Sequence, residues 1–469
     1  MRKSIALFVI LCMLLTMAAG CATGTTSVPT AAPTTAGNET TGTTASQLVK
    51  ITLDPNHDGF TASVSEAAPG SVLKLAGLKR YGYNFSSWYL DAAGTTALAE
   101  GATADKDMTV YAGWTAWDAA TTAKMDAFIA EYRLGYYIGG RPTAYEAKSF
   151  NTFFEYYYKI INGFKQTKNP GEYVKDQMTA DLKALREKVV QIADPESVSL
   201  YMWSDGKMAV EDGMDKKEFF TTFDESDFKP FLVTYMVKDQ SQVKGNVIVI
   251  AGGAYTNRAN YEEAYNTAEL FRAQNYNAYV LQRRVAPFAN IDSSLDLQRS
   301  VRYLRYHAEE LGIAKTENIV ACGFSGGGAT TIGAVENLYG DIQPSAIYPS
   351  YVSDEIDKVN SDLSAMLIIY GAFGELKTEN PKIPAGFIVV GSRDYLAHAG
   401  CVALYSQLQK LKIPVEIHSF AAAPHGFGPA TGIPGFTAYY AGVDQWTKLA
   451  GIFLDVKFGY TKASEIPAK

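Results

Sequence analysis

NIVACGFSGGG, residues 318–328, is a short apolar run that ends in a serine framed by glycines. A continuous apolar run of this length is typical of a strand buried on both faces of a sheet. The stretch that follows, GGGATTIGAVENLYG at 326–340, predicts a helix. A G-x-S-x-G sequence between a strand and a helix puts its serine on a sharp turn, where flanking side chains would clash with the neighbouring backbone. The stretch therefore predicts Ser325 as a nucleophile exposed at the carboxyl edge of a sheet.

Residues 195–469 repeat this alternation of strand and helix on both sides of the serine. Apolar runs such as NVIVIAGG (246–253) and GFIVVG (386–391) alternate with helical patterns such as SLDLQRSVRYLRYHAEELG (294–312). Strands that alternate with helices of ten residues or more indicate βαβ units and a mostly parallel sheet. We therefore predict an α/β catalytic domain whose sheet is flanked by helices.

The nucleophile needs a base, and the chain contains only five histidines. His425 lies in the glycine-rich PHGFG (424–428), directly after the last strand pattern, where this architecture places its base. His57 sits in a predicted turn, His307 on a predicted helix and His418 within a strand pattern. His398 follows closely after a candidate acid. Position favours His425, with His398 as the alternative.

The acid that orients the base should follow a strand between the serine and the histidine. GFIVVGSRD supplies Asp394, which would fix the imidazole tautomer and stabilise the imidazolium. Asp394 could also cap the helix predicted after it, and the two roles are compatible. The chain order Ser325, Asp394, His425 is the one expected of this architecture.

Stabilising the developing oxyanion requires two backbone N–H groups. Gly326, next to the serine, would supply one. The loop IAGGAY (250–255), after an apolar strand, would supply the other from Gly253 or Ala254, a choice that the sequence leaves open. The alternative interpretation of this loop is a tight strand-to-helix turn.

Residues 229–455 resemble the carbohydrate-esterase group of α/β-hydrolases, which includes acetyl-xylan and feruloyl esterases and lies close to dienelactone-hydrolase-like enzymes. The stretches that carry this resemblance are VIVIAGGAY, AYVLQRRVAP, DLQRSVRYLRYHAEELGI, NIVACGFSGGG, DEIDKVNSDLSAMLIIY, FIVVGSRD and PVEIHSFAAAPHGFG. Gly326 replaces an alanine usual in the group, and Ser325 stands where dienelactone hydrolases have cysteine. The resemblance implies hydrolysis of small acyl esters on carbohydrate through an acyl-enzyme, without a cofactor.

The amino terminus predicts export. Basic residues at 2 and 3 precede an apolar run and the small residues Ala18, Ala19 and Gly20, and Cys21 follows. Residues 1–20 therefore have the pattern of a signal peptide. The small residues that lead into Cys21 resemble a bacterial lipoprotein box, which implies diacylation of Cys21 and an extracytoplasmic location on the bacterial cell membrane. An ordinary secretory signal is the alternative. Residues 21–48, rich in Thr, Ala, Gly and Pro, predict a disordered tether.

Two further segments precede the catalytic part. Residues 49–114 contain strand patterns (VKITLD, VLKLAGL, MTVYAGW) and resemble the Listeria–Bacteroides repeat, through LDPNHDG, GLKRYGYNFSSWYLD and DMTVYAGW. The resemblance implies a β-grasp-like spacer or adhesion module that could contact the cell wall or glycans. Residues 115–194 have helical periodicity. The aromatic stripe on this segment, at 150–158, predicts either packing surface or a sugar-stacking surface.

Composition excludes some classes of function. A net charge of −7 argues against a nucleic-acid surface. After the signal and Cys21 only Cys322 and Cys401 remain, without metal-ligand spacing, and we expect Cys322 to be a buried thiol. Two other interpretations stay open at this stage: a serine peptidase of the prolyl-oligopeptidase type and a non-catalytic surface adhesion protein.

Overall fold

The computed structural model describes residues 48–57, 62–136, 145–191, 198–203, 208–214, 224–431, 440 and 442–462. The chain forms two compact units. The described residues of the first are 48–53, 63–74 and 99–109, and the remaining described residues form the second. The predicted signal peptide, Cys21 and the predicted tether up to residue 47 lie outside the described residues. Within the described part of the chain, no helix is both long and apolar enough to cross a membrane.

The predicted small β module is present as antiparallel strand pairs. β1 (Val49–Asp54) pairs with β2 (Ser63–Ala67), and β3 (Tyr83–Tyr89) pairs with β4 (Met108–Ala116). The predicted strand VLKLAGL is wrong. Around Val72 the backbone forms an isolated bridge with Thr103. A single bridge cannot continue into a ladder, so this stretch runs as irregular backbone.

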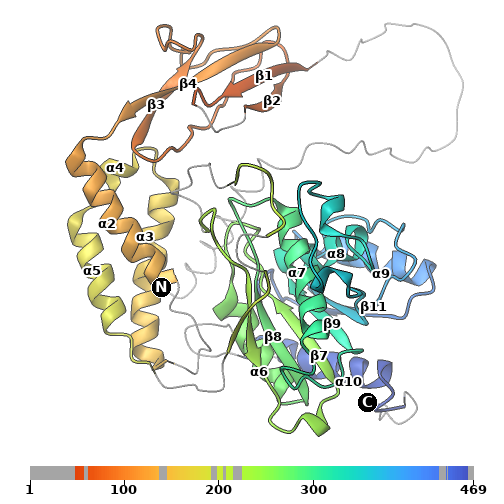
Figure 1. Cartoon of the computed structure of the whole chain (residues 1–469). Helices are drawn as coiled ribbons and strands as arrows, with labels where there is room; N and C mark the ends of the chain where they lie inside the picture. Colours follow the sequence, from red (N-terminus) through yellow and green to blue (C-terminus); the bar gives the residue numbers. More distant parts are fainter. Residues whose placement is uncertain are drawn as a thin grey trace, which may run out of the picture. The chain divides into compact units, whose positions relative to one another are not determined.

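Helices follow, as the periodicity predicts (Figure 1). They are α2 Ala119–Tyr136, α3 Ala147–Gln166, α4 Pro170–Tyr173 and α5 Asp176–Glu187. Most of the aromatic stripe of α3 is buried. The Phe150 and Phe154 rings lie 4.8 and 4.6 Å from the ring of Tyr261, which belongs to the catalytic part of the chain. These contacts agree with the packing interpretation of the stripe.

The predicted α/β sheet has eight strands in the order β12-β11-β10-β9-β7-β8-β6-β5. Neighbours from β12 to β8 are parallel, whereas β6 runs antiparallel to both β8 and β5. The strands are β5 Ser199–Tyr201, β6 Phe231–Tyr235, β7 Gly245–Ile250, β8 Tyr276–Gln282, β9 Ile319–Phe324, β10 Ala365–Ile369, β11 Ala385–Gly391 and β12 Val415–Phe420. This arrangement confirms the predicted fold class, an α/β-hydrolase sheet flanked by helices.

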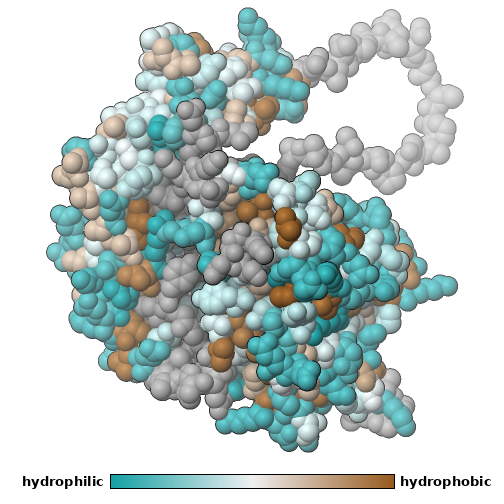
Figure 2. All heavy atoms as spheres, viewed as in Figure 1, coloured by the Kyte–Doolittle hydropathy of each residue, from teal (hydrophilic) through white to brown (hydrophobic). Residues whose placement is uncertain are grey.

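Helices cover both faces of this sheet (Figure 1). They are α6 Tyr265–Arg272, α7 Asn290–Tyr306, α8 Gly326–Asn337, α9 His398–Lys410 and α10 Trp446–Lys457. Shorter turns are η4 Gln240–Gln242, η6 Pro344–Ala346, η7 Ile356–Lys358 and η8 Val443–Gln445, and a π-helix, η5 Asn260–Ala264, leads into α6. The molecular face in Figure 2 is mostly hydrophilic, and its brown residues form small separate groups.

The core is divided between the two faces by the alternation of the strand side chains. Val247 and Val249 of β7 belong to a cluster with residues of α6 and α10, whereas Ile248 and Ile250 belong to a second cluster with residues of α7 and α8. Both sets are fully buried. Burial on both faces explains why these strands are continuous apolar runs in the sequence.

The end of β8 is held by buried charges on α7. The Arg284 guanidinium forms an ion pair with Asp296 at 2.8 Å, and both side chains are fully buried. Removing one partner of such a pair leaves an uncompensated buried charge, which costs about 3–5 kcal/mol. The pair fixes the position of the chain immediately after β8, beside the candidate site.

Candidate active site

Ser325 lies on a strained turn between β9 and α8. Its backbone has φ +46° and ψ −118°, a region that non-glycine residues seldom occupy. A Cβ atom on Gly323 would collide with the carbonyl of Gly327, and one on Gly327 would collide with the carbonyl of Ile250. The glycines of the G-x-S-x-G sequence are therefore required by close backbone approach, as the sequence predicts.

The structure brings the three predicted triad residues together. Ser325 Oγ lies 2.9 Å from His425 Nε2, and His425 Nδ1 lies 2.8 Å from Asp394 Oδ2. Ser325 is 4% exposed and Asp394 1% exposed, so the pairing is shielded from water. A carboxylate that accepts the Nδ1 proton leaves Nε2 free to accept the serine proton. The arrangement can deprotonate a serine during attack on an acyl carbon.

Asp394 also organises the turn that follows it. Its Oδ1 accepts hydrogen bonds from Leu396 N at 3.0 Å and from Ala397 N at 2.9 Å. The predicted helix-capping role needs a correction, because the N-cap residue of α9 is Ala397 and Asp394 holds the preceding turn. These two bonds fix the carboxylate that faces His425.

The other histidines have polar contacts elsewhere. His307 caps the C-terminus of α7 and its Nδ1 lies 2.7 Å from Glu310, while His418 on β12 lies 3.3 Å from Glu416. His398, the alternative base, begins α9, with Nε2 3.3 Å from Ser419 Oγ. His57 is partly exposed and lies at a bend shortly after β1. Of the histidines, His425 is the one hydrogen-bonded to Ser325.

The predicted oxyanion loop follows β7 and lies against the serine. Gly253, Ala254 and Tyr255 have consecutive positive φ angles of 106°, 50° and 57°. A Cβ on Gly326 would lie 3.2 Å from Ala254 N, so the Ala254 amide is adjacent to the residue that follows the nucleophile. This proximity favours Ala254 over Gly253 as the partner of Gly326, and the oxyanion roles of all three residues remain predictions.

Sequence reasoning missed buried polar residues that hold this loop. Glu263 Oε2 accepts a hydrogen bond from Gly252 N at 2.5 Å. The Arg283 guanidinium donates to the carbonyls of Ala251 and Gly252 at 3.1 and 3.3 Å. A single peptide is thus held at both its N–H and its C=O. In the sequence, Glu263 belongs to a helical pattern and Arg283 follows an apolar strand, and neither pattern reveals which loop the side chain reaches.

Neither remaining cysteine competes with Ser325 as a nucleophile. Cys322 is fully buried in β9, and burial raises the pKa of its thiol well above the ordinary value. Burial also raises the pKa of Cys401 to about 11. Both therefore remain thiols at neutral pH. Among the described residues, no cluster of three or more His, Cys, Asp or Glu side chains is placed to hold a metal ion.

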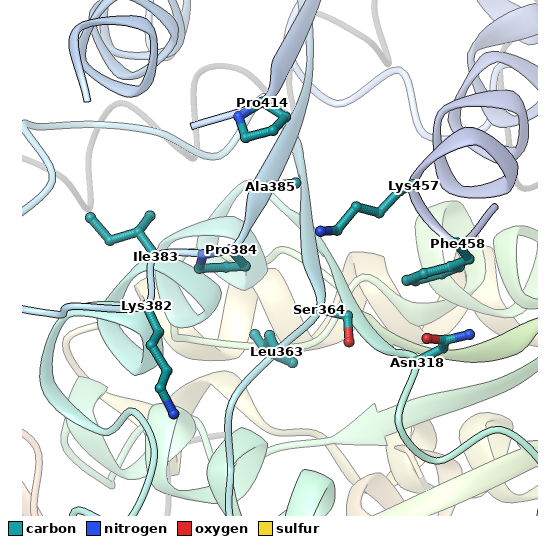
Figure 3. Close-up of a pocket in the computed structure, with 10 residues that line it drawn as sticks. All are labelled: Asn318, Leu363, Ser364, Lys382, Ile383, Pro384, Ala385, Pro414, Lys457 and Phe458. Carbon is teal, nitrogen blue, oxygen red and sulfur yellow. The ribbon is translucent and has the colours of Figure 1, made fainter. Parts of the chain in front are cut away.

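A cavity of about 510 Å³ lies at the opposite edge of the sheet (Figure 3). Its lining includes Asn318, Ser364 and Pro414, which immediately precede β9, β10 and β12. Ser325 instead follows the carboxyl end of β9. Parallel strands present their carboxyl ends at one common edge, where this class of fold places its chemistry. The cavity is thus separate from the candidate active site.

The sheet topology, the strained serine turn and the paired histidine define the class of this domain as α/β-hydrolase. Residues 232–360 match the family BD-FAE, and residues 38–113 match the Listeria–Bacteroides repeat domain. Both matches confirm the resemblances inferred from the sequence. The BD-FAE match includes Ser325 and the loop before Tyr255. The part of the chain that contains the candidate site therefore has the α/β-hydrolase fold and resembles the BD-FAE family over the matched residues.

Solved structures with a similar chain path include several esterases. An acetyl ester-xyloside bifunctional hydrolase from Caldicellulosiruptor lactoaceticus is 22% identical over 55% of this chain and 95% of its own, with a TM-score of 0.44. Esterase 2 from Thermogutta terrifontis is 17% identical over 58% and 97%, with a TM-score of 0.42. The carboxylesterase Cest-2923 from Lactobacillus plantarum is 16% identical over 49% and 93%, with a TM-score of 0.40. No curated protein matches the sequence.

Proposed function

We propose that this protein is an extracytoplasmic serine esterase that removes small acyl groups, acetyl or feruloyl, from carbohydrate. The observation that carries the proposal is the hydrogen-bonded series Asp394–His425–Ser325, with its serine on the strained turn after β9. The Ala254 amide beside Gly326 supports an adjoining oxyanion site. Together these groups provide a nucleophile, a base and donors for the developing charge.

The geometry supports a two-step reaction. Ser325 Oγ attacks the acyl carbon while His425 Nε2 takes the hydroxyl proton, and the carbonyl oxygen becomes an oxyanion that accepts from the backbone N–H groups. When the bond to the sugar oxygen breaks, His425 returns its proton to that oxygen and an acyl-serine remains. Water, deprotonated by the same histidine, then releases the carboxylic acid and restores the serine.

Exposed aromatic residues beside the triad support a ring-shaped substrate. The Phe373 side chain, which follows β10, is 43% exposed, and its ring centroid lies 6.4 Å from that of His425. Tyr395, next to Asp394 in the chain, is 94% exposed. Large apolar rings left in water at the edge of a site are suited to stacking on a ligand. A sugar ring or a feruloyl ring would provide such a partner.

The substrate class is tested by comparing kcat/KM for acetylated xylo-oligosaccharides, short p-nitrophenyl esters, aminoacyl-prolyl amides and long-chain triglycerides. We expect the acetylated oligosaccharide to be hydrolysed at least about tenfold faster than the triglyceride or the amide, a difference of about 1.4 kcal/mol. Ser325→Ala protein measures the uncatalysed background. Preference for the triglyceride, or equal rates on the amide, would exclude the carbohydrate-esterase proposal, and the second result would favour a peptidase.

The proposed location rests on the signal sequence, which ends at Gly20 before Cys21. We expect mass spectrometry of membrane-extracted protein to find a diacylglyceryl group on an amino-terminal Cys21. Cys21→Ser protein should leave the membrane fraction, because the acyl chains supply the affinity for the bilayer. Cys12→Ser, which changes a residue within the signal peptide, is the matched control. Unchanged membrane retention of Cys21→Ser would contradict the lipid anchor.

A further inference from the structure

A buried hydrogen-bonded series joins the oxyanion loop to the histidine loop behind the triad. Glu263, on the π-helix η5, accepts from Gly252 N through Oε2 and from the Tyr370 hydroxyl through Oε1, at 2.5 and 2.9 Å. The Tyr370 oxygen in turn accepts from Gly428 N at 2.9 Å. Gly428 lies three residues after His425. Both loops that carry candidate catalytic groups are therefore tied to one carboxyl group.

The backbone at this point is unusual in several places. The π-helix is a rare element that is frequent at functional sites. Tyr370 has φ +41°, a strained value for a tyrosine. Its ring also packs edge-on against the His425 imidazole, with centroids 4.9 Å apart. Glu263 is 4% exposed and Tyr370 is fully buried. Such strain persists only where the surrounding structure requires it, and here it brings Tyr370 between the carboxyl group and the histidine.

The hydrogen-bond donors around the Glu263 carboxyl group favour its ionised form. Gly252 N–H and Gly428 N–H both donate inward, so Oε2 and the tyrosine oxygen both act as acceptors. The tyrosine proton then completes the contact with Oε1. A proton on Oε1 would occupy this contact itself, and the Tyr370 hydroxyl would lose the carboxylate as the acceptor of its proton. Burial raises the pKa of Glu263, and the hydrogen bonds from Gly252 and Tyr370 and the charges of His425 and Arg283 oppose that rise.

Charged and titratable groups face Glu263 from every neighbouring element. They are Glu262 on the same π-helix, Arg283 after β8, Cys322 on β9, Tyr370 after β10 and His425 after β12. Asp394, after β11, acts on Tyr370. Arg283 carries the positive charge of this group. It donates to the carbonyl of Ala251, which belongs to the same peptide group as the Gly252 N–H bound by Glu263. The negative carboxylate and the positive guanidinium therefore act on opposite ends of one peptide.

We propose that Glu263 is a positioning residue of the active site: its carboxylate holds the oxyanion loop and the histidine loop in register and stabilises the His425 imidazolium that forms during attack. The proposal rests on the serine-hydrolase function proposed above. Tyr370 passes the effect to the histidine loop, because its hydroxyl connects the carboxylate with Gly428 and its ring contacts His425.

The test compares Glu263→Gln with wild type in two assays from about pH 5 to 9: kcat and KM on p-nitrophenyl acetate, and the rate at which a fluorophosphonate labels Ser325. Glutamine keeps the shape and removes the charge. A carboxylate beside an imidazole stabilises its protonated form, so removing it should move the acid limb of both profiles to lower pH by about 0.5–1 unit. We expect kcat to fall about tenfold with KM within about twofold, as for a transition-state interaction.

Glu269→Gln is the matched control, since it removes a carboxylate from α6 that pairs with Arg272 and should leave both profiles unchanged. An acid limb of Glu263→Gln that stays in place or moves to higher pH overturns the proposal. If this variant does not fold, Tyr370→Phe decides, and a kcat within twofold of wild type would then overturn it. If the wild-type protein is labelled at Ser325 but cleaves no ester, the proposed function is contradicted. The pH profiles of labelling then test the positioning role of Glu263. Wild-type protein that does not label overturns both.

Discussion

Ser325→Ala should lower kcat on ester substrates by about 10⁴–10⁶-fold. The reason is that Oγ is the atom within 2.9 Å of His425 Nε2 and the one on the strained turn that faces the oxyanion loop. Alanine removes the nucleophile and leaves water to attack unaided. The fold should be retained, because Ala differs from Ser here by one oxygen and adds no atom to the crowded turn between the flanking glycines.

The measurement is kcat on p-nitrophenyl acetate, with far-ultraviolet circular dichroism and thermal melting to establish that the variant is folded. Ser364→Ala is the matched control. It makes the same chemical change at the opposite edge of the sheet, where the Ser364 hydroxyl donates to the Glu317 carbonyl. The control should keep full activity. Turnover of folded Ser325→Ala within tenfold of wild type would exclude this serine as the nucleophile.

Asp394→Asn should lower kcat by about 10³–10⁴-fold. The asparagine amide can donate a hydrogen bond to His425 Nδ1, which would place the imidazole proton on Nε2. Nε2 would then donate to Ser325 and could not accept the serine proton. The oxygen that accepts from Leu396 N and Ala397 N is available in Asn as well as in Asp. We therefore expect the turn before α9 to persist, and the loss to appear in kcat rather than in stability.

The control for this variant is Asp239→Asn. The Asp239 carboxylate accepts a hydrogen bond from Ser241 N and holds a turn that is far from the triad in the sequence. Kinetics and thermal melting on the two variants separate a catalytic loss from a folding defect. Equal loss of activity in both, or a tenfold or smaller loss in folded Asp394→Asn, would contradict the role of Asp394 as the group that orients His425.

The arrangement of Ser325, Asp394 and His425 could be predicted because each residue follows its own strand pattern. Parallel strands deliver their carboxyl ends to one edge, so residues far apart in sequence converge there without any knowledge of contacts. The scarcity of histidine narrowed the choice of base. The aromatic stripe of α3 was readable as packing surface because its periodicity is helical, although its partner Tyr261 could not be named from the sequence.

Glu263, Tyr370 and Arg283 could not be predicted in the same way. YEEAYN looks like the polar start of an exposed helix, since adjacent acids are usually solvated. The π-helix η5 changes the facing of these side chains and buries Glu263. Local pattern contains no signal for that register change. VLKLAGL is the converse case. Its apolar alternation predicted a strand, but the backbone there forms an isolated bridge at Val72 instead of a strand ladder.

The most direct measurement of the central claim is to label the mature wild-type protein with a fluorophosphonate, digest it and locate the adduct by mass spectrometry. A phosphonylated serine shows which hydroxyl the base activates, whatever the natural substrate. We predict one adduct, on Ser325, that is lost in His425→Ala protein. An adduct on another residue, or labelling of Ser325 that persists unchanged without His425, would contradict the proposed nucleophile and its base.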